Sequence, residues 1–239
     1  MLLLELTFDD PVTNVAYDEA LLEQAESNDS HPEVLRLWES PQPLVVLGRS
    51  SPYAKEVAQE FCRQQGIGFV RRCSGGQSIV AGPGCLMYAV LLDYRKRPEL
   101  RMLDVAHQFV MGQMQQALSQ VGIETQIEGT SDLTLGGRKV SGNSMRCKRN
   151  WMIYHGTMIY QMDLDLIANC LGDPVRQPDY RSGRDHRSFL NQLPVEGSIL
   201  RQAIARQWQA APGSVEVLEK DLVEMMESKY LTATWNEKV

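Results

Sequence analysis

Three short stretches of the sequence carry side chains that could hold or activate an anionic substrate, and the first is RRCSGGQSIVAGPG at residues 71–84. Gly75 and Gly76 have no side chains, so their backbone N–H groups could approach a ligand closely, and Ser74 adds a hydroxyl. With Arg71 and Arg72 beside them, this composition predicts an anion-binding loop, although a plain tight turn with edge arginines has the same composition. The stretch matches neither the dinucleotide-binding fingerprint nor the P-loop pattern.

The second stretch, SDLTLGGRKVSGNSM at residues 131–145, brings a lysine and a carboxylate together. Two glycines between two runs of alternating polarity predict a two-residue β-hairpin. Its register places Thr134 opposite Lys139 and Asp132 opposite Ser141, so that these four polar residues share one face. The other face takes the apolar residues Leu133, Leu135 and Val140.

Lys139 is then a diagonal neighbour of Asp132, within reach of a long side chain. A lysine ammonium is a compact, mobile donor that can grip a carboxylate or a phosphate as charge develops. A solvated outer face of the sheet would carry the same residues, so the hairpin alone leaves both interpretations open.

The third stretch is WMIYHGTMIY at residues 151–160. Gly156 inside an apolar strand predicts a bulge or a backbone that another group approaches closely. His155 fits either a hydrogen-bonded structural histidine or an acid–base residue, and Thr157 follows it on the same face of the strand.

Elements of both kinds must position these residues. A first strand is expected at the N-terminus, and further strands are expected at residues 34–38, 44–48, 68–72, 86–93, 131–135, 138–146 and 151–160. Helices are expected at residues 14–25 with Thr13 as the cap, and at 54–65, 100–119, 163–171, 197–210 and 220–229. The nearly continuous apolar run at 86–93 predicts a strand that is covered on both faces. These elements predict an α+β fold around a single sheet, in one continuous domain over residues 1–239.

Composition narrows the class of protein. The net charge of −6 argues against bulk attraction to nucleic acid, and we expect neither a membrane span nor a signal peptide. The five cysteines form no C-x-x-C pair, which favours a cytoplasmic protein without disulfides and without a dedicated metal site. They are Cys62, Cys73, Cys85, Cys147 and Cys170.

Taken in order, these stretches resemble the lipoate–protein ligase branch of the biotin/lipoate ligase and lipoyl-transferase superfamily. The resemblance covers residues 10–195, and residues 196–239 form a C-terminal extension. It is carried by NVAYDEALL (14–22), LRLWESPQPLVVLGRS (35–50), RRCSGGQSIV (71–80), SDLTLGGRKVSGNSMR (131–146), YHGTMIYQMDLDLIANCL (154–171) and RSGRDHRSFLNQLP (181–194).

The resemblance implies a mixed, largely antiparallel sheet flanked by helices, in the class II synthetase-like architecture of these catalytic domains. It implies that lipoate is activated with ATP and Mg²⁺ as lipoyl-adenylate, and it leaves open whether the acyl substrate is lipoate or octanoate. The acyl group then passes to a lysine of a lipoyl acceptor domain or a glycine-cleavage carrier protein. Lys139 corresponds to the essential lysine, and Asp132 would orient it or help to hold Mg²⁺. The implied acyl- and adenylate-binding residues are Arg71, Arg72, Ser74, Gly75, Gly76, Gln77, Ser78, Ser141, Gly142, His155, Gly156 and Thr157.

Departures from the family pattern leave alternatives open. Gln77 stands where many ligases have a third glycine, and Ala81 where many have a histidine. Residues 195–239 leave no room for the large accessory domain of two-domain ligases, so a small accessory subunit would supply it. Otherwise the chain is an octanoyl- or lipoyl-transferase that works without ATP.

Such transferases use a cysteine nucleophile, which their patterns place either before the Asp132 strand or in a loop that corresponds to LGDPVRQ (171–177). Neither segment contains a cysteine. Cys147 lies between two basic residues that could lower its pKa, so it is a candidate nucleophile. A non-catalytic acyl-binding protein is the third alternative. Arg181, Arg184 and Arg187 could dock an acidic acceptor domain or form a solvated basic loop.

Overall fold

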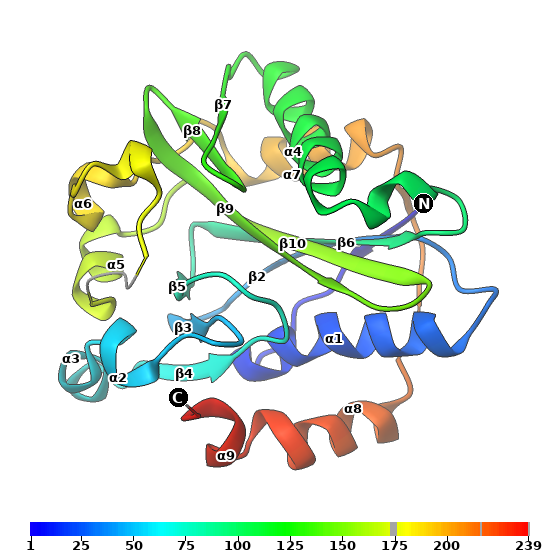
Figure 1. Cartoon of the computed structure of the whole chain (residues 1–239), viewed down its shortest axis with the longest axis horizontal. Coiled ribbons are helices and arrows are strands. Elements are labelled where there is room, and N and C mark those ends of the chain that lie inside the picture. Colours follow the sequence, from blue (N-terminus) through cyan, green and yellow to red (C-terminus); the bar gives the residue numbers. More distant parts are fainter. Residues whose placement is uncertain (173–175, 216, 239) are drawn as a thin grey trace.

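A largely antiparallel eight-stranded sheet forms the centre of the computed structural model, which describes residues 1–172, 176–215 and 217–238 (Figure 1). The strand order is β11-β1-β2-β6-β10-β9-β8-β7, with β1 parallel to β2 and β11 and all other neighbours antiparallel. The strands are β1 (Leu2–Glu5), β2 (Val34–Glu39), β6 (Cys85–Asp93), β7 (Gln126–Glu128), β8 (Asp132–Leu135), β9 (Arg138–Cys147), β10 (Trp151–Ile159) and β11 (Ala211–Pro212). The expected mixed α+β class is confirmed.

A second, three-stranded sheet packs beside the first, so the expectation of a single sheet is wrong. Its order is β4-β3-β5, with β3 parallel to β4 and antiparallel to β5. The strands are β3 (Leu44–Leu47), β4 (Gly68–Arg71) and β5 (Ile79–Ala81). Local polarity predicted β3 and β4 as strands, but it carries no information on which sheet a strand joins, because the partner strands are distant in sequence.

Helices cover both faces of the large sheet. α4 (Leu103–Ser119) and α7 (Gly197–Gln207) pack on one face, and α1 (Pro11–Ser27) packs on the other, with α8 (Glu219–Met225) behind it (Figure 1). The shorter elements are α2 (Tyr53–Glu56), α3 (Gln59–Gln64), α5 (Leu164–Cys170), α6 (His186–Phe189), α9 (Ala233–Asn236), the 3₁₀ turns η1 (Pro98–Arg101) and η2 (Asp179–Arg181), and the π-helical turn η3 (Met226–Tyr230). Among the described residues, no helix combines the length and the apolar character that a membrane span requires.

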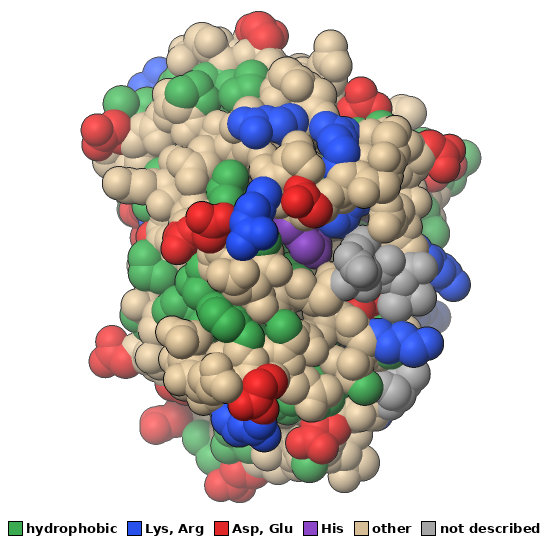
Figure 2. Space-filling model, turned by 90° about the vertical axis from the view of Figure 1, so that its left-hand side faces the viewer, with side chains coloured by type: hydrophobic (Ala, Val, Ile, Leu, Met, Phe, Trp, Pro, Cys, Tyr) green, Lys and Arg blue, Asp and Glu red, His purple; other side chains and the backbone are tan. Residues whose placement is uncertain are grey.

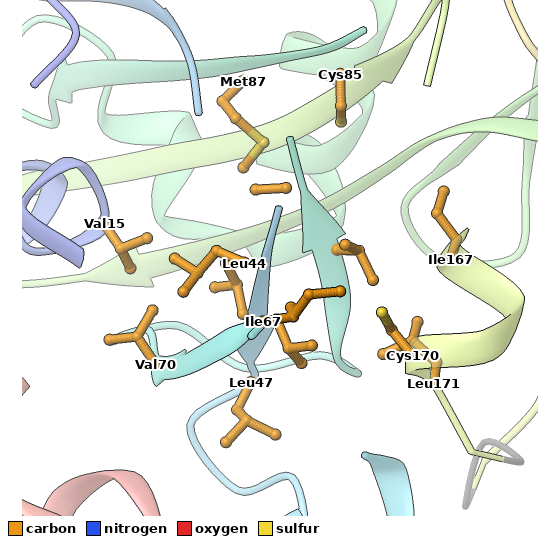
Figure 3. Close-up of a cluster of buried hydrophobic side chains, with 14 of the residues drawn as sticks. Val15, Leu44, Leu47, Ile67, Val70, Cys85, Met87, Ile167, Cys170 and Leu171 are labelled. Carbon is orange, nitrogen blue, oxygen red and sulfur yellow. The ribbon is translucent and has the colours of Figure 1, made fainter. Parts of the chain in front are cut away.

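Side chains alternate along the central strands between two apolar cores. On β10, Met152 and Tyr154 face α4 and α7, whereas Trp151 and Ile153 face α1. Because both faces are covered, β6 and β10 are buried along their whole length, as residues 86–93 predicted. A third cluster packs between the small sheet, the neighbouring part of the large sheet and α5, and Figure 3 shows its side chains converging from these elements.

The first helix begins earlier than expected. The carboxylate of Asp10 accepts hydrogen bonds from the N–H groups of Val12 and Thr13 at 3.3 and 3.0 Å. An aspartate in this position satisfies N–H groups that have no partner within the helix, and Pro11 suits the first turn. Thr13, the expected cap, therefore lies inside the helix.

The single helix expected over residues 54–65 is divided into α2 and α3. Between them the chain is extended, and Val57 forms an antiparallel bridge with Leu171. The N–H of Ala58 donates to the carbonyl of Cys170 at 2.9 Å. These contacts with the end of α5 divert the chain from the helical path that its local pattern favours.

The β8–β9 hairpin has the expected turn but a different register beyond it. Thr134 pairs with Lys139 as predicted, and then a β-bulge leaves Val140 as an extra residue. The pairs beyond the bulge are Leu133 with Ser141 and Asp132 with Gly142.

The bulge overturns the expected division of the hairpin into a polar and an apolar face. Ser141 now pairs with Leu133 and is completely buried, whereas Asp132 and Lys139 remain accessible. One extra residue changes the side to which every later side chain of the strand points. Lys139 and Asp132 nevertheless remain neighbours and form an ion pair.

Candidate active site

A cavity of about 370 Å³ lies between the two sheets. Its walls come from α1, from β2, β6, β8, β9 and β10 of the large sheet, from β3 and β5 of the small sheet, and from the loops that flank them. The predicted site residues that line it are Arg72, Gly76, Gln77, Ser78, Asp132, Lys139, Gly142, His155, Gly156 and Thr157. The tertiary structure thus brings together residues from all three stretches that the sequence singled out.

Five predicted residues do not line this cavity: Arg71, Ser74, Gly75, Ser141 and Cys147. Several lining residues were not predicted: Val15, Asp18, Trp38, Val46, Ile79, Met87, Thr130, Ser131, Asn143, Ser144, Arg176, Gln177 and Pro178. Most of these are apolar or small polar residues, and nothing in their local sequence separates them from ordinary core or loop residues.

Lys139 and Asp132 form an ion pair at the cavity wall. The Lys139 ammonium lies 2.8 Å from Asp132 Oδ1, and the two side chains are 22% and 13% exposed. The N–H of Asn191 fixes the Lys139 main chain by donating to its carbonyl at 2.8 Å. A charged donor that is oriented by a carboxylate and only partly exposed to water can stabilise negative charge that develops beside it.

Gly142 provides the space that this lysine occupies. A Cβ at Gly142 would lie 2.7 Å from Lys139 Nζ and 2.8 Å from its Cε, so a side chain there would displace the ammonium. The N–H of Gly142 donates to Thr157 Oγ1 at 3.2 Å, which ties β9 to β10 directly behind the lysine.

Arg72 organises the Ser-Gly-Gly loop from within. Its guanidinium donates to Ser74 Oγ at 3.1 Å and to the carbonyls of Gly75 and Gln77, at 2.5 and 2.9 Å. A further bond at 3.1 Å reaches the Val46 carbonyl on β3. Burial lowers the pKa of Arg72 to about 10, which still leaves the side chain charged at neutral pH. The loop is therefore shaped around a cation that belongs to the protein.

Arg71 lies outside the cavity and is fully buried. Arginine has five N–H donors, and here all of them donate to main-chain carbonyls. The acceptors are the carbonyls of Gly48, Ser51, Trp235, Asn236 and Lys238, at 2.7 to 3.0 Å. No N–H of its guanidinium is left for an anionic ligand, so Arg71 joins the C-terminal segment to the start of the loop.

A buried polar relay connects α1 to the loop. His155 Nδ1 lies 3.1 Å from Asp18 Oδ2, and His155 Nε2 lies 2.5 Å from Ser74 Oγ. The other Asp18 oxygen accepts from the Arg36 guanidinium at 2.7 Å, and Arg36 is completely buried. Asp18 and Arg36 were not predicted. Arg36 is a charged residue within the otherwise apolar run VLRLW (34–38), and that was its signal in the sequence, whereas Asp18 precedes Glu19 in a helix of mixed polarity and carried no such signal.

The distances in this relay are those of a nucleophile, a base and an acid, but Ser74 is poorly placed to attack a substrate. It is 1% exposed, it does not line the cavity, and its Oγ already accepts from Arg72. His155 does line the cavity. The relay therefore holds the loop against β10 and sets the orientation of the imidazole.

The close approach predicted at Gly156 is made by Asn143. A Cβ at Gly156 would lie 1.8 Å from Asn143 Oδ1 and 2.9 Å from Tyr88 Cε1. The Tyr88 hydroxyl donates to Asn143 Oδ1 at 2.5 Å, and Asn143 Nδ2 donates to the Ser131 carbonyl at 2.8 Å. No bulge occurs here, because the β10–β6 register is continuous through Gly156.

A second, smaller cavity of about 70 Å³ adjoins the first. Both are lined by Asp132, Lys139 and Thr157, so the ion pair lies where the two cavities meet. The lining of the second cavity includes the apolar residues Ile79, Val80, Cys85, Ile159, Ile167, Leu171, Phe189 and Leu190.

The cysteines differ in their surroundings. Cys147 is at the end of β9, half-buried and away from both cavities, so the structure does not bring this candidate nucleophile to the lysine. Cys85 lines the second cavity, where burial raises the pKa of its thiol to about 12. A thiol with so high a pKa is a poor nucleophile at neutral pH. Of the loop 171–177, expected to correspond to the cysteine loop of one transferase branch, residues 173–175 lie outside the described residues.

Asp132 has both carboxylate oxygens engaged. Oδ1 pairs with Lys139, and Oδ2 accepts from the Tyr180 hydroxyl at 2.7 Å. Within the described parts of the chain, no group of three His, Cys, Asp or Glu side chains is placed to hold a metal ion. The two contacts of Asp132 are those that its predicted orienting role requires, and that role stays a prediction.

The basic segment after η2 makes mainly internal contacts. Arg184 donates to the carbonyls of Gly137 and Tyr180 at 3.0 and 2.7 Å, and Arg187 pairs with Asp165 at 2.5 Å. Figure 2 shows an acidic side chain among the basic ones on this side of the molecule. A role in docking an acceptor remains a prediction from the sequence.

Comparison with known proteins agrees with this geometry. Residues 10–193 match the family model of the lipoyl protein ligase A/B catalytic domain. Lipoate–protein ligase 1 of Staphylococcus aureus is 27% identical over 95% of this chain and 70% of its own length. Octanoyltransferase LipM of Brevibacillus brevis is 24% identical over 95% of this chain and 94% of its own length.

Two further lipoate–protein ligases are longer, and the chain spans 58% and 46% of them. Among solved structures, the bipartite lipoate protein ligase of Thermoplasma acidophilum superimposes with a TM-score of 0.82. It is 19% identical over 99% of this chain and 95% of that one, which identifies the same fold.

Proposed function

The chain belongs to the lipoyl protein ligase A/B catalytic-domain family, and on this premise we propose that it is a lipoate–protein ligase. It would join lipoate to ATP as lipoyl-adenylate and transfer the lipoyl group to a lysine of an acceptor domain. The observation that carries the proposal is the Lys139–Asp132 pair at the junction of two cavities. Adenylate formation brings a carboxylate and a phosphate to one point, and that point needs a cation with a compartment on either side.

The larger cavity suits the acyl arm. Val15, Trp38 and Met87 give it an apolar wall, and Lys139 lies at its junction with the second cavity. An apolar chain gains free energy by leaving water for such a wall, while its carboxylate meets the ammonium. The second cavity, which is lined mainly by apolar side chains, suits the nucleotide base.

In the first half-reaction, a lipoate carboxylate oxygen attacks the α-phosphorus of ATP and pyrophosphate leaves. In the second, the acceptor amine attacks the acyl carbon, AMP leaves with the bonding electrons, and the amine loses a proton. Lys139 donates to the carboxyl and phosphate oxygens as charge develops on them. Asp132 keeps the ammonium aimed at that point. Mg²⁺ would arrive on the phosphates of ATP and would neutralise part of their charge.

Intact-mass analysis of an unmodified lipoyl acceptor domain tests the proposal. One reaction contains lipoate, ATP and Mg²⁺, and the other contains octanoyl-carrier protein without nucleotide. A lipoyl mass shift in the first reaction only, lost in Lys139→Ala, is the expected result. A shift in the second reaction only would overturn the ligase in favour of a transferase.

The octanoyltransferase is kept as a second candidate because octanoyltransferase LipM of Brevibacillus brevis is 24% identical over 95% of this chain. No described cysteine lines the larger cavity, and the thiol of Cys85 in the second is poorly ionised. The ligase therefore agrees better with the site.

The proposed ligase would need an acceptor protein and an accessory subunit. The acceptor would be a lipoyl domain or a glycine-cleavage carrier protein in the cytoplasm. A small accessory subunit would assist adenylate formation. If so, adding that subunit restores lipoylation to a reaction that is silent with this chain alone.

A further inference from the structure

The turn η2, which lies outside the sheet, contacts the Lys139–Asp132 pair through Tyr180. We propose that Tyr180 is a positioning residue for Lys139 and acts through Asp132. The inference rests on the proposed function and deepens it. The Tyr180 hydroxyl donates to Asp132 Oδ2 at 2.7 Å, while Asp132 Oδ1 lies 2.8 Å from Lys139 Nζ. Tyr180 does not line either cavity, so it reaches the substrate only through the carboxylate.

One hydrogen bond on each oxygen fixes the plane of the Asp132 carboxylate. With Oδ2 held by the phenol, Oδ1 points at the ammonium, and the lysine is kept in one position. Without the phenol, the carboxylate can rotate and the ammonium can follow it. A misplacement of about 1 Å at a reacting centre is enough to slow catalysis by roughly 100-fold.

The phenol is suited to this task. Burial raises the pKa of Tyr180, and the nearby Asp132 charge raises it further, so the hydroxyl stays protonated and remains a donor. A hydrogen bond from a neutral donor to a carboxylate is stronger than one between neutral groups.

The tyrosine ring is itself held in place. It packs against Phe189 with 5.3 Å between ring centroids, and a Cβ at Gly129 would lie 3.5 Å from its Cε1. Arg184 donates to the Tyr180 carbonyl at 2.7 Å and to the Gly137 carbonyl at 3.0 Å, which fastens this segment to the hairpin turn. The segment and the hairpin therefore hold each other around the ion pair.

Tyr180→Phe removes only the hydroxyl, and Tyr160→Phe is a matched control. The Tyr160 hydroxyl donates to Glu39 Oε2 at 2.9 Å, a similar bond to a carboxylate outside both cavities. We expect Tyr180→Phe to lower kcat about tenfold, the effect of one lost hydrogen bond to a charged group, with little change in the KM for lipoate or ATP. Tyr160→Phe should leave kcat unchanged, although both variants lose a similar bond.

A double variant distinguishes a positioning role from an independent one. Combined with Asp132→Ala, Tyr180→Phe should cause no further loss of kcat, because its effect passes through Asp132. An unchanged kcat in Tyr180→Phe, or two losses that multiply in the double variant, would overturn the inference.

A readout without turnover separates this inference from the proposed function. Acetylation of Lys139 by an N-hydroxysuccinimide ester, followed by peptide mass spectrometry, reports how firmly the ammonium is held. It should be faster in Tyr180→Phe than in the wild type or in Tyr160→Phe. Equal rates overturn the role of Tyr180 even if lipoylation is observed, whereas absent lipoylation with a faster rate contradicts only the proposed function.

Discussion

Arg71 and Asn236 are 165 positions apart in the chain, yet two hydrogen bonds join them directly. The main-chain N–H of Arg71 donates to Asn236 Oδ1 at 2.8 Å, and its guanidinium donates to the Asn236 carbonyl at 2.9 Å. Trp235 Nε1 returns a bond to the Arg71 carbonyl at 2.8 Å. The C-terminal helix α9 thus contacts the end of β4, where the Ser-Gly-Gly loop begins.

Asn236→Ala should weaken both the fold and the loop. The buried Arg71 N–H loses its acceptor, which costs about 1–3 kcal/mol of unfolding free energy. Because the loop is less firmly held, we also expect the KM for the acyl substrate to rise more than kcat falls. Urea unfolding and steady-state kinetics measure the two effects. Asn169→Ala, which removes only a surface acceptor for Arg187, should change stability by less than about 0.5 kcal/mol. Similar losses of unfolding free energy in both variants would contradict a stabilising role for the Arg71–Asn236 contact.

Lys139→Ala should lower the rate of acyl transfer by about 10²–10³ without unfolding the protein, as for other removed charge-stabilising donors. Lys148→Ala is the matched control, because Lys148 also forms an ion pair, with Glu23 at 2.6 Å, and is 27% exposed against 22% for Lys139. An unaltered rate in Lys139→Ala would show that the ammonium takes no part in the chemistry. Circular dichroism of both variants checks that each remains folded.

Gly156→Ala should damage the cavity wall. The new methyl group would overlap Asn143 Oδ1 and press on Tyr88, so overpacking should cost about 1–3 kcal/mol. Gly112→Ala offers the contrast, since that glycine is in the middle of α4 with nothing within 4 Å of the added Cβ. There we expect a gain of about 0.4–1 kcal/mol from the lower entropy of the unfolded chain. Thermal unfolding of both variants shows whether Gly156→Ala lowers the stability and Gly112→Ala raises it.

Cys147→Ser should keep full acyl transfer activity, because Cys147 lies away from both cavities. In the native protein, iodoacetamide should label this half-buried thiol before the others, and peptide mapping identifies the site. Loss of activity in Cys147→Ser, with the fold intact, would revive a thioester mechanism.

Alkaline pH should weaken the fold through its buried thiols. Burial raises the pKa of Cys73, Cys85 and Cys170 from 9.0 to about 12. The folded protein therefore keeps three protons that the unfolded chain releases between pH 9 and 12. Their stabilisation is complete below pH 9 and decreases above it, by about 1.4 kcal/mol per pH unit for each thiol. Urea unfolding at pH 8 and 10 measures the decrease, and Cys85→Ala should make it shallower.

The sequence alone determined the features that depend on neighbouring residues. Two glycines between alternating runs specified the hairpin turn and the pairing of Thr134 with Lys139, because turn geometry sets the register beside it. The apolar run at 86–93 specified a strand covered on both faces. The three motif-bearing stretches also supplied most of the polar residues that line the cavity.

The tertiary structure decided what depends on partners far away in the chain. Arg71 and Arg72 are adjacent in sequence, but only Arg72 reaches the cavity, because distant carbonyls of the C-terminal segment receive Arg71. Likewise Asp18 meets His155, and Tyr180 meets Asp132, only once the elements have packed. A local pattern specifies which way a side chain faces. It does not specify which group a buried donor or charge will meet, because that depends on how the whole chain satisfies its buried polar groups.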